Sequence, residues 1–154
     1  VVSKGLVEPE LWQHIQSVAL AIFAAGQAAA DAAGLILVDT KYEFGMINGK
    51  LALIDEVHTP DSSRYWVKES YQNALDENRA PAQYDKEHLR LWLKGRGYSG
   101  DGVAPQLTDE IRAEVSQRYI DAFERLTQTE FVPGQLPPAQ RVDQNIKSYL
   151  KENI

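Results

Sequence analysis

Two stretches decide the fold of this chain: Gly34–Gly45, GLILVDTKYEFG, and Leu51–Trp66, LALIDEVHTPDSSRYW. Each begins with an apolar run of the length and composition typical of a buried β-strand. Between them stands Asn48-Gly49, a strong signal for a tight turn joining two antiparallel strands. The chain is therefore expected to form a β-hairpin, with strands at 35–39 and 51–57.

The rest of the chain is mostly helical by periodicity, because apolar residues recur every three or four positions. With the hairpin, this predicts an α+β fold in which an antiparallel sheet packs with several helices. The expected positions are a helix over 9–33, a loop-rich stretch over 58–83 with a helical turn near 68–76, a short helix capped by Asp85, a long helix capped by Thr108, a linker at 132–138 and a last helix from Pro138.

Length and composition exclude several classes of protein. At 154 residues the chain suits one globular domain, and its 44% hydrophobic and 25% charged residues are ordinary for a folded protein. A net charge of -6 and a pI near 5.1 argue against nucleic-acid binding. No apolar run approaches the roughly 18 residues that span a bilayer, so no membrane partner is expected. The lack of cysteine excludes disulfides and thiolate metal sites and fits a cytoplasmic protein.

Charged residues follow the predicted strands at alternating positions. Asp39, Lys41 and Glu43 would share one face of a strand, because residues two apart point the same way. A solvated sheet face with a cross-strand ion pair explains this pattern without any function. The other interpretation is a site for a magnesium-bound nucleotide, because Asp55 on the partner strand could share a metal with Glu43 while the lysine neutralises phosphate.

The shared-metal interpretation sets a condition on the turn. With a two-residue turn, Glu43 would pair with Ile54 and Asp55 would lie on the opposite face. A three-residue loop over 47–49, with Gly49 left-handed and bulged, would put both carboxylates on one face. We therefore predict a three-residue loop or a bulge.

The two stretches, followed by YDKEHLRLWL at 84–93, resemble the phosphoribosylaminoimidazole-succinocarboxamide synthase (SAICAR synthetase) family of purine biosynthesis. The resemblance is to the sequences of its plant and bacterial members. The resemblance runs from about Gly5 to about Thr129. It implies the C-terminal catalytic lobe of a two-lobed, kinase-like ATP-binding ligase fold at 1–131, followed by a linker and helical extension at 132–154. Nothing in the chain matches the family's N-terminal lobe, so we do not expect this part to be active on its own.

The resemblance also implies an activity. Enzymes of this family join L-aspartate to carboxyaminoimidazole ribonucleotide (CAIR) with ATP and Mg²⁺, through an acyl phosphate. The expected partners are these small molecules, the missing lobe and a second copy of the chain in a homo-oligomer, in the cytoplasm or, in a plant, the plastid stroma. Two alternatives stay open: a small-molecule phosphotransferase on a related scaffold, and a non-catalytic binding module.

Residue roles follow from the same resemblance, position by position. Catalytic roles are implied for Lys41, Asp61 and Arg64, with Lys41 also contacting ATP phosphates. Metal and cofactor binding is implied for Glu43 and Asp55. The ribonucleotide and its carboxylates would be held by Asp61, Ser63, Arg64, Lys86 and Arg90.

Overall fold

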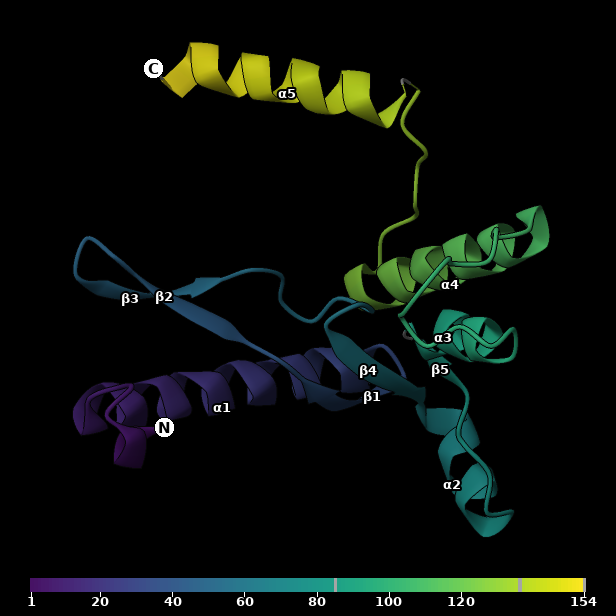
Figure 1. The fold of residues 1–154 in the computed structure, drawn as a ribbon, viewed down its shortest axis with the longest axis horizontal. Helices are drawn as coiled ribbons and strands as arrows, with labels where there is room; N and C mark the ends of the chain where they lie inside the picture. Colours follow the sequence, from purple (N-terminus) through teal and green to yellow (C-terminus); the bar gives the residue numbers. More distant parts are fainter. Residues whose placement is uncertain (85, 136, 154) are drawn as a thin grey trace.

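Two small antiparallel sheets and a set of helices make up the computed structural model, which describes residues 1–84, 86–135 and 137–153 (Figure 1). The expected α+β class is confirmed. One sheet has the strand order β1-β4-β5, and the other consists of β2 and β3. The elements are a 3-10 turn at Val2–Lys4, α1 (Pro9–Ala32), β1 (Leu35–Thr40), β2 (Glu43–Ile47), β3 (Lys50–Ile54), β4 (Ser63–Val67), α2 (Lys68–Asp76), β5 (Gln83–Tyr84), α3 (Glu87–Lys94), α4 (Asp109–Thr127) and α5 (Pro138–Asn153).

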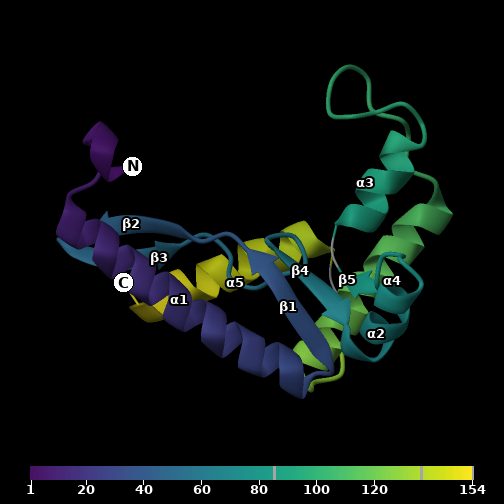
Figure 2. The same ribbon diagram turned by 90° about the horizontal axis from the view of Figure 1, so that it is seen from below.

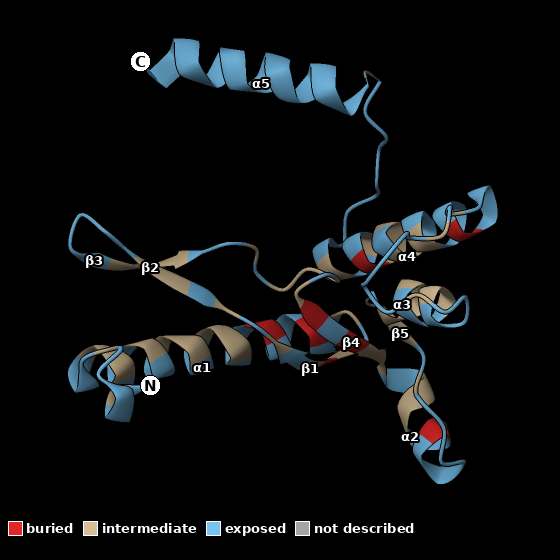
Figure 3. Cartoon of the chain, viewed as in Figure 1, coloured by how far each residue is buried: buried red, intermediate tan, exposed pale blue. Residues whose placement is uncertain are grey.

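The core lies where the end of α1 packs against the three-stranded sheet (Figures 2 and 3). Leu35 and Leu37 of β1 and Tyr65 of β4 are almost fully buried there against Ala30 of α1. The small alanine side chain lets the helix approach the strand closely, and the buried aliphatic and aromatic area supplies the main stabilising term. The core therefore fixes the first half of β1 and the middle of β4, next to the charged residues at the end of β1.

The two strands of the expected hairpin do not belong to one continuous sheet. β1 ends at Thr40 and pairs with β4, whereas β2 starts at Glu43 and pairs with β3. Strand β4 falls in a stretch that was expected to be loop-rich, so that prediction was wrong. In the structure Ser63, Arg64 and Tyr65 alternate as buried, exposed and buried, as residues of a strand do. In the sequence this strand is short and directly follows turn-forming residues, which hid it.

The predicted three-residue loop is also wrong. Ile47 pairs with Lys50 and Glu43 with Ile54 throughout β2 and β3, so the turn contains only Asn48 and Gly49. Both have left-handed backbones, with φ of 52° and 74°. A two-residue turn of this kind matches the twist of the strands, and Asn-Gly adopts it at little steric cost, which explains why the shorter turn is preferred.

The predicted helices agree closely with the structure. Helix α1 ends one residue before the expected position, the turn near 68–76 is the full helix α2, and α5 begins at Pro138 as predicted. Thr108 caps α4, because its side chain accepts a hydrogen bond from the amide of Ile111 at 3.4 Å. The expected capping role of Asp85 lies outside the described residues.

Helix α5 stands apart from the other elements at the end of an extended connection (Figure 1), and all its residues from 138 to 153 are exposed (Figure 3). Its apolar residues, Val142, Ile146, Tyr149 and Leu150, therefore face solvent. The expected division at residue 131 stays a prediction.

Helix α1 is long and apolar enough to cross a membrane, with 24 residues and a mean hydropathy of 1.2 over an 18-residue window. This differs from the expectation that no stretch of the chain approaches such a length. Only 11% of that window is buried, and mostly buried core helices and signal sequences near an N-terminus pass the same test of length and composition. Helix α1 packs along β1.

Candidate functional site

A cavity of about 260 Å³ opens where the end of β1, the 58–64 loop (HTPDSSR) and the start of α3 meet. These three segments are far apart in sequence, and the β1–β4 pairing brings the first two together. The cavity gathers six of the eight residues predicted from the sequence: Lys41, Asp61, Ser63, Arg64, Lys86 and Arg90. The other two, Glu43 and Asp55, lie beside it and are joined to it through Lys41.

The 58–64 loop is ordered by hydrogen bonds around Thr59. The amides of Asp61 and Ser62 each donate to the Thr59 hydroxyl at 3.3 Å, and the amide of Ser63 donates to the Thr59 carbonyl at 2.9 Å. The Thr59 hydroxyl in turn donates to the Glu56 carboxylate. Neither Thr59 nor Glu56 was among the residues predicted for the site, although a threonine two residues before an aspartate is a common turn former.

The hydroxyl of Ser63, a lining residue of the cavity, is held by Thr40. Ser63 is only 5% exposed, and its oxygen lies 2.9 Å from the Thr40 hydroxyl at the end of β1. The amide of Lys41 also donates to the Ser62 carbonyl at 3.3 Å. These contacts fix the end of β1 against the loop, so Thr40 belongs to the site although it was not predicted from the sequence.

Each cation of the cavity wall has a carboxylate neighbour. Lys86 Nζ lies 3.3 Å from Asp61 Oδ1, and Arg64 Nη2 lies 3.6 Å from Asp39 Oδ2. Arg90 pairs with Glu87, a further cavity residue that was not predicted from the sequence. The Lys86–Asp61 and Arg64–Asp39 pairs are about half exposed and contribute little to stability. An anionic ligand can therefore replace a carboxylate partner at small cost.

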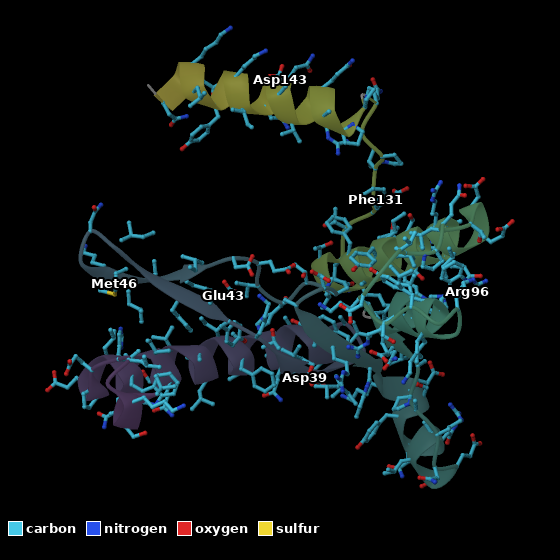
Figure 4. All side chains as sticks on the ribbon, viewed as in Figure 1. Asp39, Glu43, Met46, Arg96, Phe131 and Asp143 are labelled. Atoms are coloured by element: carbon cyan, nitrogen blue, oxygen red, sulfur yellow. The ribbon has the colours of Figure 1, made fainter. Side chains whose placement is uncertain are left out.

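Two carboxylates converge on one ammonium group beside the cavity. Lys41 Nζ lies 2.6 Å from Glu43 Oε1 and 2.9 Å from Asp55 Oδ2. The two hydrogen bonds raise the pKa of Lys41 far above its usual value, and the bond to Lys41 lowers the pKa of Asp55. Lys41 and Asp55 are therefore charged at neutral pH. Figure 4 shows Glu43 at the base of the hairpin, near the junction with β1.

The condition set for a shared metal was a register that puts Glu43 and Asp55 on one face, and this register is not found. The carboxylates meet by another route. Asp55 follows the last residue of β3 with a left-handed backbone, φ 66°, which turns its side chain out of the strand alternation. The register therefore fails that condition, but the two carboxylates still converge on the ammonium of Lys41.

No cluster of three or more histidine, aspartate or glutamate side chains suited to a metal is found in the part of the chain that the structure describes. A metal bound by Glu43 and Asp55 would therefore need oxygens from water or ligand for the rest of its shell. That is the usual arrangement of Mg²⁺ at nucleotide sites, so the donor set fits such an ion.

Comparison with known proteins points to one family. The model of the SAICAR synthetase family matches residues 1–107. The phosphoribosylaminoimidazole-succinocarboxamide synthases of Bacteroides fragilis and Legionella pneumophila are 41% and 42% identical to the chain; in each case the match covers 97% of the chain and 49% of the relative. The solved SAICAR synthase of Saccharomyces cerevisiae, complexed with SAICAR, is 30% identical with a TM-score of 0.69, over 84% of this chain and 42% of that one. The chain thus spans about half the length of the curated relatives it matches.

Proposed function

The chain belongs to the SAICAR synthetase family, and we propose that it forms part of an ATP-dependent ligase that condenses L-aspartate with CAIR to give SAICAR, ADP and phosphate. The observation that carries the proposal is the cavity that gathers four cationic side chains, Lys41, Arg64, Lys86 and Arg90, beside a carboxylate pair. The substrates are all anionic, which suits this arrangement.

We assign the nucleotide end of the site to the Lys41 cluster, which consists of Lys41, Glu43 and Asp55. Glu43 and Asp55 would hold Mg²⁺, which would neutralise charge on the phosphates of ATP. Lys41 now bridges the two carboxylates. The two carboxylates would hold the ion, and the Lys41 ammonium would neutralise charge on a phosphate oxygen of the bound nucleotide.

The ribonucleotide end of the site would be the cavity itself. Arg64, Lys86 and Arg90 would hold the phosphate and carboxylate groups, and Ser63 and Asp61 would accept or donate hydrogen bonds to the sugar and ring. The yeast relative was solved with SAICAR, which supports a site for this class of molecule. Held there, the CAIR carboxylate would take the γ-phosphoryl group of ATP to form an acyl phosphate. The aspartate amine would then displace phosphate.

Positioning would supply much of the catalysis, because the reaction joins three anions that repel one another. Lys41 has a special place in this scheme, since it lines the cavity and also bridges the carboxylate pair. It would therefore neutralise charge at the point where the ribonucleotide and the nucleotide meet. Lys41, Asp61 and Arg64 are accordingly the proposed catalytic residues.

We assign residues 1–131 to a C-terminal catalytic lobe and 132–154 to a linker and helical extension. The remainder of the enzyme would include an N-terminal lobe that covers the nucleotide, and this lobe is the expected partner of the chain. Assembly into a homo-oligomer and a cytoplasmic location are further parts of the proposal.

The experiment measures ADP release by the intact gene product that contains this chain, with CAIR and Mg-ATP, in the presence and absence of aspartate. Release that requires all three substrates is the expected result. Release without aspartate would show a phosphotransferase instead. No release under any condition, from a protein shown to be folded, would favour a non-catalytic binding module.

A further inference from the structure

His58 lies at a junction between three elements, although nothing so far gives it a role. Its Nε2 atom is 2.5 Å from the hydroxyl of Tyr42, and the two rings meet edge to face with centroids 5.5 Å apart. Its carbonyl accepts a hydrogen bond from the Tyr65 hydroxyl at 2.6 Å. The side chain of His58 is therefore held by Tyr42 of the β1–β2 connection, and its backbone by Tyr65 of β4.

The ring of His58 rests on helix α1 at Gly26. A Cβ atom at Gly26 would lie 2.1 Å from Cε1 of the imidazole, far inside contact distance. Glycine is unfavourable in the interior of a helix, and Gly26 is buried in the last third of α1. The close approach of the imidazole gives a physical reason for a glycine at this position.

The backbone of His58 is also unusual. Its φ of 56° is left-handed, which is uncommon for a residue other than glycine and persists only where surrounding contacts fix it. The contacts with Tyr42, Tyr65 and the helix supply that constraint. His58 begins the 58–64 loop, Tyr42 stands between Lys41 and Glu43, and Tyr65 follows Arg64, so these contacts tie both ends of the loop to the Lys41 cluster.

We propose that His58 is a positioning residue that holds the 58–64 loop against the Lys41 cluster. The loop is thereby kept in the conformation that binds the ribonucleotide. The inference rests on the proposed function for the identity of that ligand. It follows that weakening the contacts of His58 lowers the fraction of molecules with an ordered loop. Apparent affinity falls by the same fraction, whereas the chemical step in the bound complex is little changed.

Two variants of the intact gene product test this without removing a cavity residue. Tyr42→Phe deletes only the hydroxyl that meets His58, and Gly26→Ala adds a methyl group where the imidazole rests. The matched controls are Tyr149→Phe on exposed helix α5 and Gln27→Ala on the exposed side of α1. Amide hydrogen exchange is followed by mass spectrometry in the loop and, as a check on folding, in β1.

The amide of Ser63, which donates to the Thr59 carbonyl, is the reporter for the loop. We expect exchange in the 58–64 loop to be about tenfold faster in both variants, with β1 and both controls unchanged. Loop exchange equal to that of the wild type overturns the proposal, whatever the activity of the enzyme. Equal acceleration in β1 also overturns it, because His58 would then support the fold as a whole.

The second measurement is binding and turnover. We expect the Kd and KM for CAIR to rise about tenfold in both variants, with kcat and the KM for ATP within about twofold of the wild type. A fall in kcat at unchanged KM would overturn the proposal, because His58 would then act in the chemical step. If the wild type binds CAIR but shows no aspartate-dependent release of ADP, the ligase fails while the Kd and exchange results still decide the role of His58.

Discussion

Asp55 Oδ2 lies 2.9 Å from Nζ of Lys41, although strand alternation would turn the aspartate to the far face of the hairpin. The strand pairing of β2 and β3 is regular, so the sheet does not bring the two residues together. The left-handed backbone of Asp55 does, because it ends the alternation one residue after β3. A local backbone feature thus creates the carboxylate pair on which the proposed metal site depends.

Removing the negative charge of either carboxylate, Glu43 or Asp55, is expected to lower the turnover rate. Glu43→Gln and Asp55→Asn should each lower kcat by about 10²-fold, because each removes charge that stabilises the metal mainly in the transition state. Asparagine tolerates a left-handed backbone, so Asp55→Asn keeps the local conformation. The measurement is aspartate-dependent ADP release by the intact enzyme. Glu130→Gln, an exposed carboxylate without a partner among the described residues, is the control, and near-normal turnover in both test variants would refute the metal assignment.

The two-residue turn predicts that Gly49 contributes to stability through its backbone. Its φ is 74°, so Gly49→Ala should lower the free energy of unfolding by about 1 kcal/mol, because a Cβ atom is unfavourable in the left-handed region. Urea denaturation measures this. Lys50→Ala, next to the turn at the start of β3, should change stability by less than about 0.5 kcal/mol. Equal effects would show that the turn conformation is not what matters.

Sequence periodicity gave the helices and the strand cores because these depend on local spacing. The 58–64 loop and the residues 84–93 could be linked to one site by resemblance to a family, but their convergence depends on the β1–β4 pairing. That pairing joins residues such as Asp39 and Arg64, which local patterns do not connect. Because this pairing joins residues that are far apart in the sequence, β4 and the role of Thr40 were not predicted.

The errors at the hairpin have a different origin. Register can be worked out from the turn, but the left-handed conformation of Asp55 cannot, because aspartate has only a modest preference for it. The extra contact of His58 with Gly26 is likewise a tertiary effect. A glycine inside an alanine-rich helix was the available signal, since glycine in such a place often marks a close approach.

The core tyrosine predicts a measurable hydrogen-bond contribution. Tyr65 is 1% exposed, and burial raises the pKa of its hydroxyl to about 12, so the group stays protonated and donates to the His58 carbonyl. Tyr65→Phe should lower the free energy of unfolding by about 1–2 kcal/mol, because it leaves that carbonyl without its donor. Tyr149→Phe, on exposed α5, should change it by less than about 0.5 kcal/mol. Chemical denaturation at neutral pH compares them, and equal stability of wild type and Tyr65→Phe would contradict the assigned hydrogen bond.

The half-buried imidazole predicts how stability depends on pH. Burial lowers the pKa of His58 below its ordinary value of 6.5, so the unfolded chain binds the proton more readily than the folded protein does. The stability that His58 contributes is then fully present above pH 6.5 and is lost as the pH falls below it. The neighbouring Tyr42 does not add to this change, because burial raises its pKa and it stays neutral.

The test compares urea midpoints of the wild type and His58→Asn between pH 7.5 and 5.5. Asparagine tolerates the left-handed backbone but does not titrate, and His14 and His88 are common to both proteins, so their effects cancel. The wild type should lose more stability than the variant over this range. A variant that is less stable at pH 7.5 and approaches the wild type at pH 5.5 is the expected result. Parallel curves would mean that His58 titrates as it does in the unfolded chain, and that its contacts with Tyr42 and helix α1 do not exclude the proton.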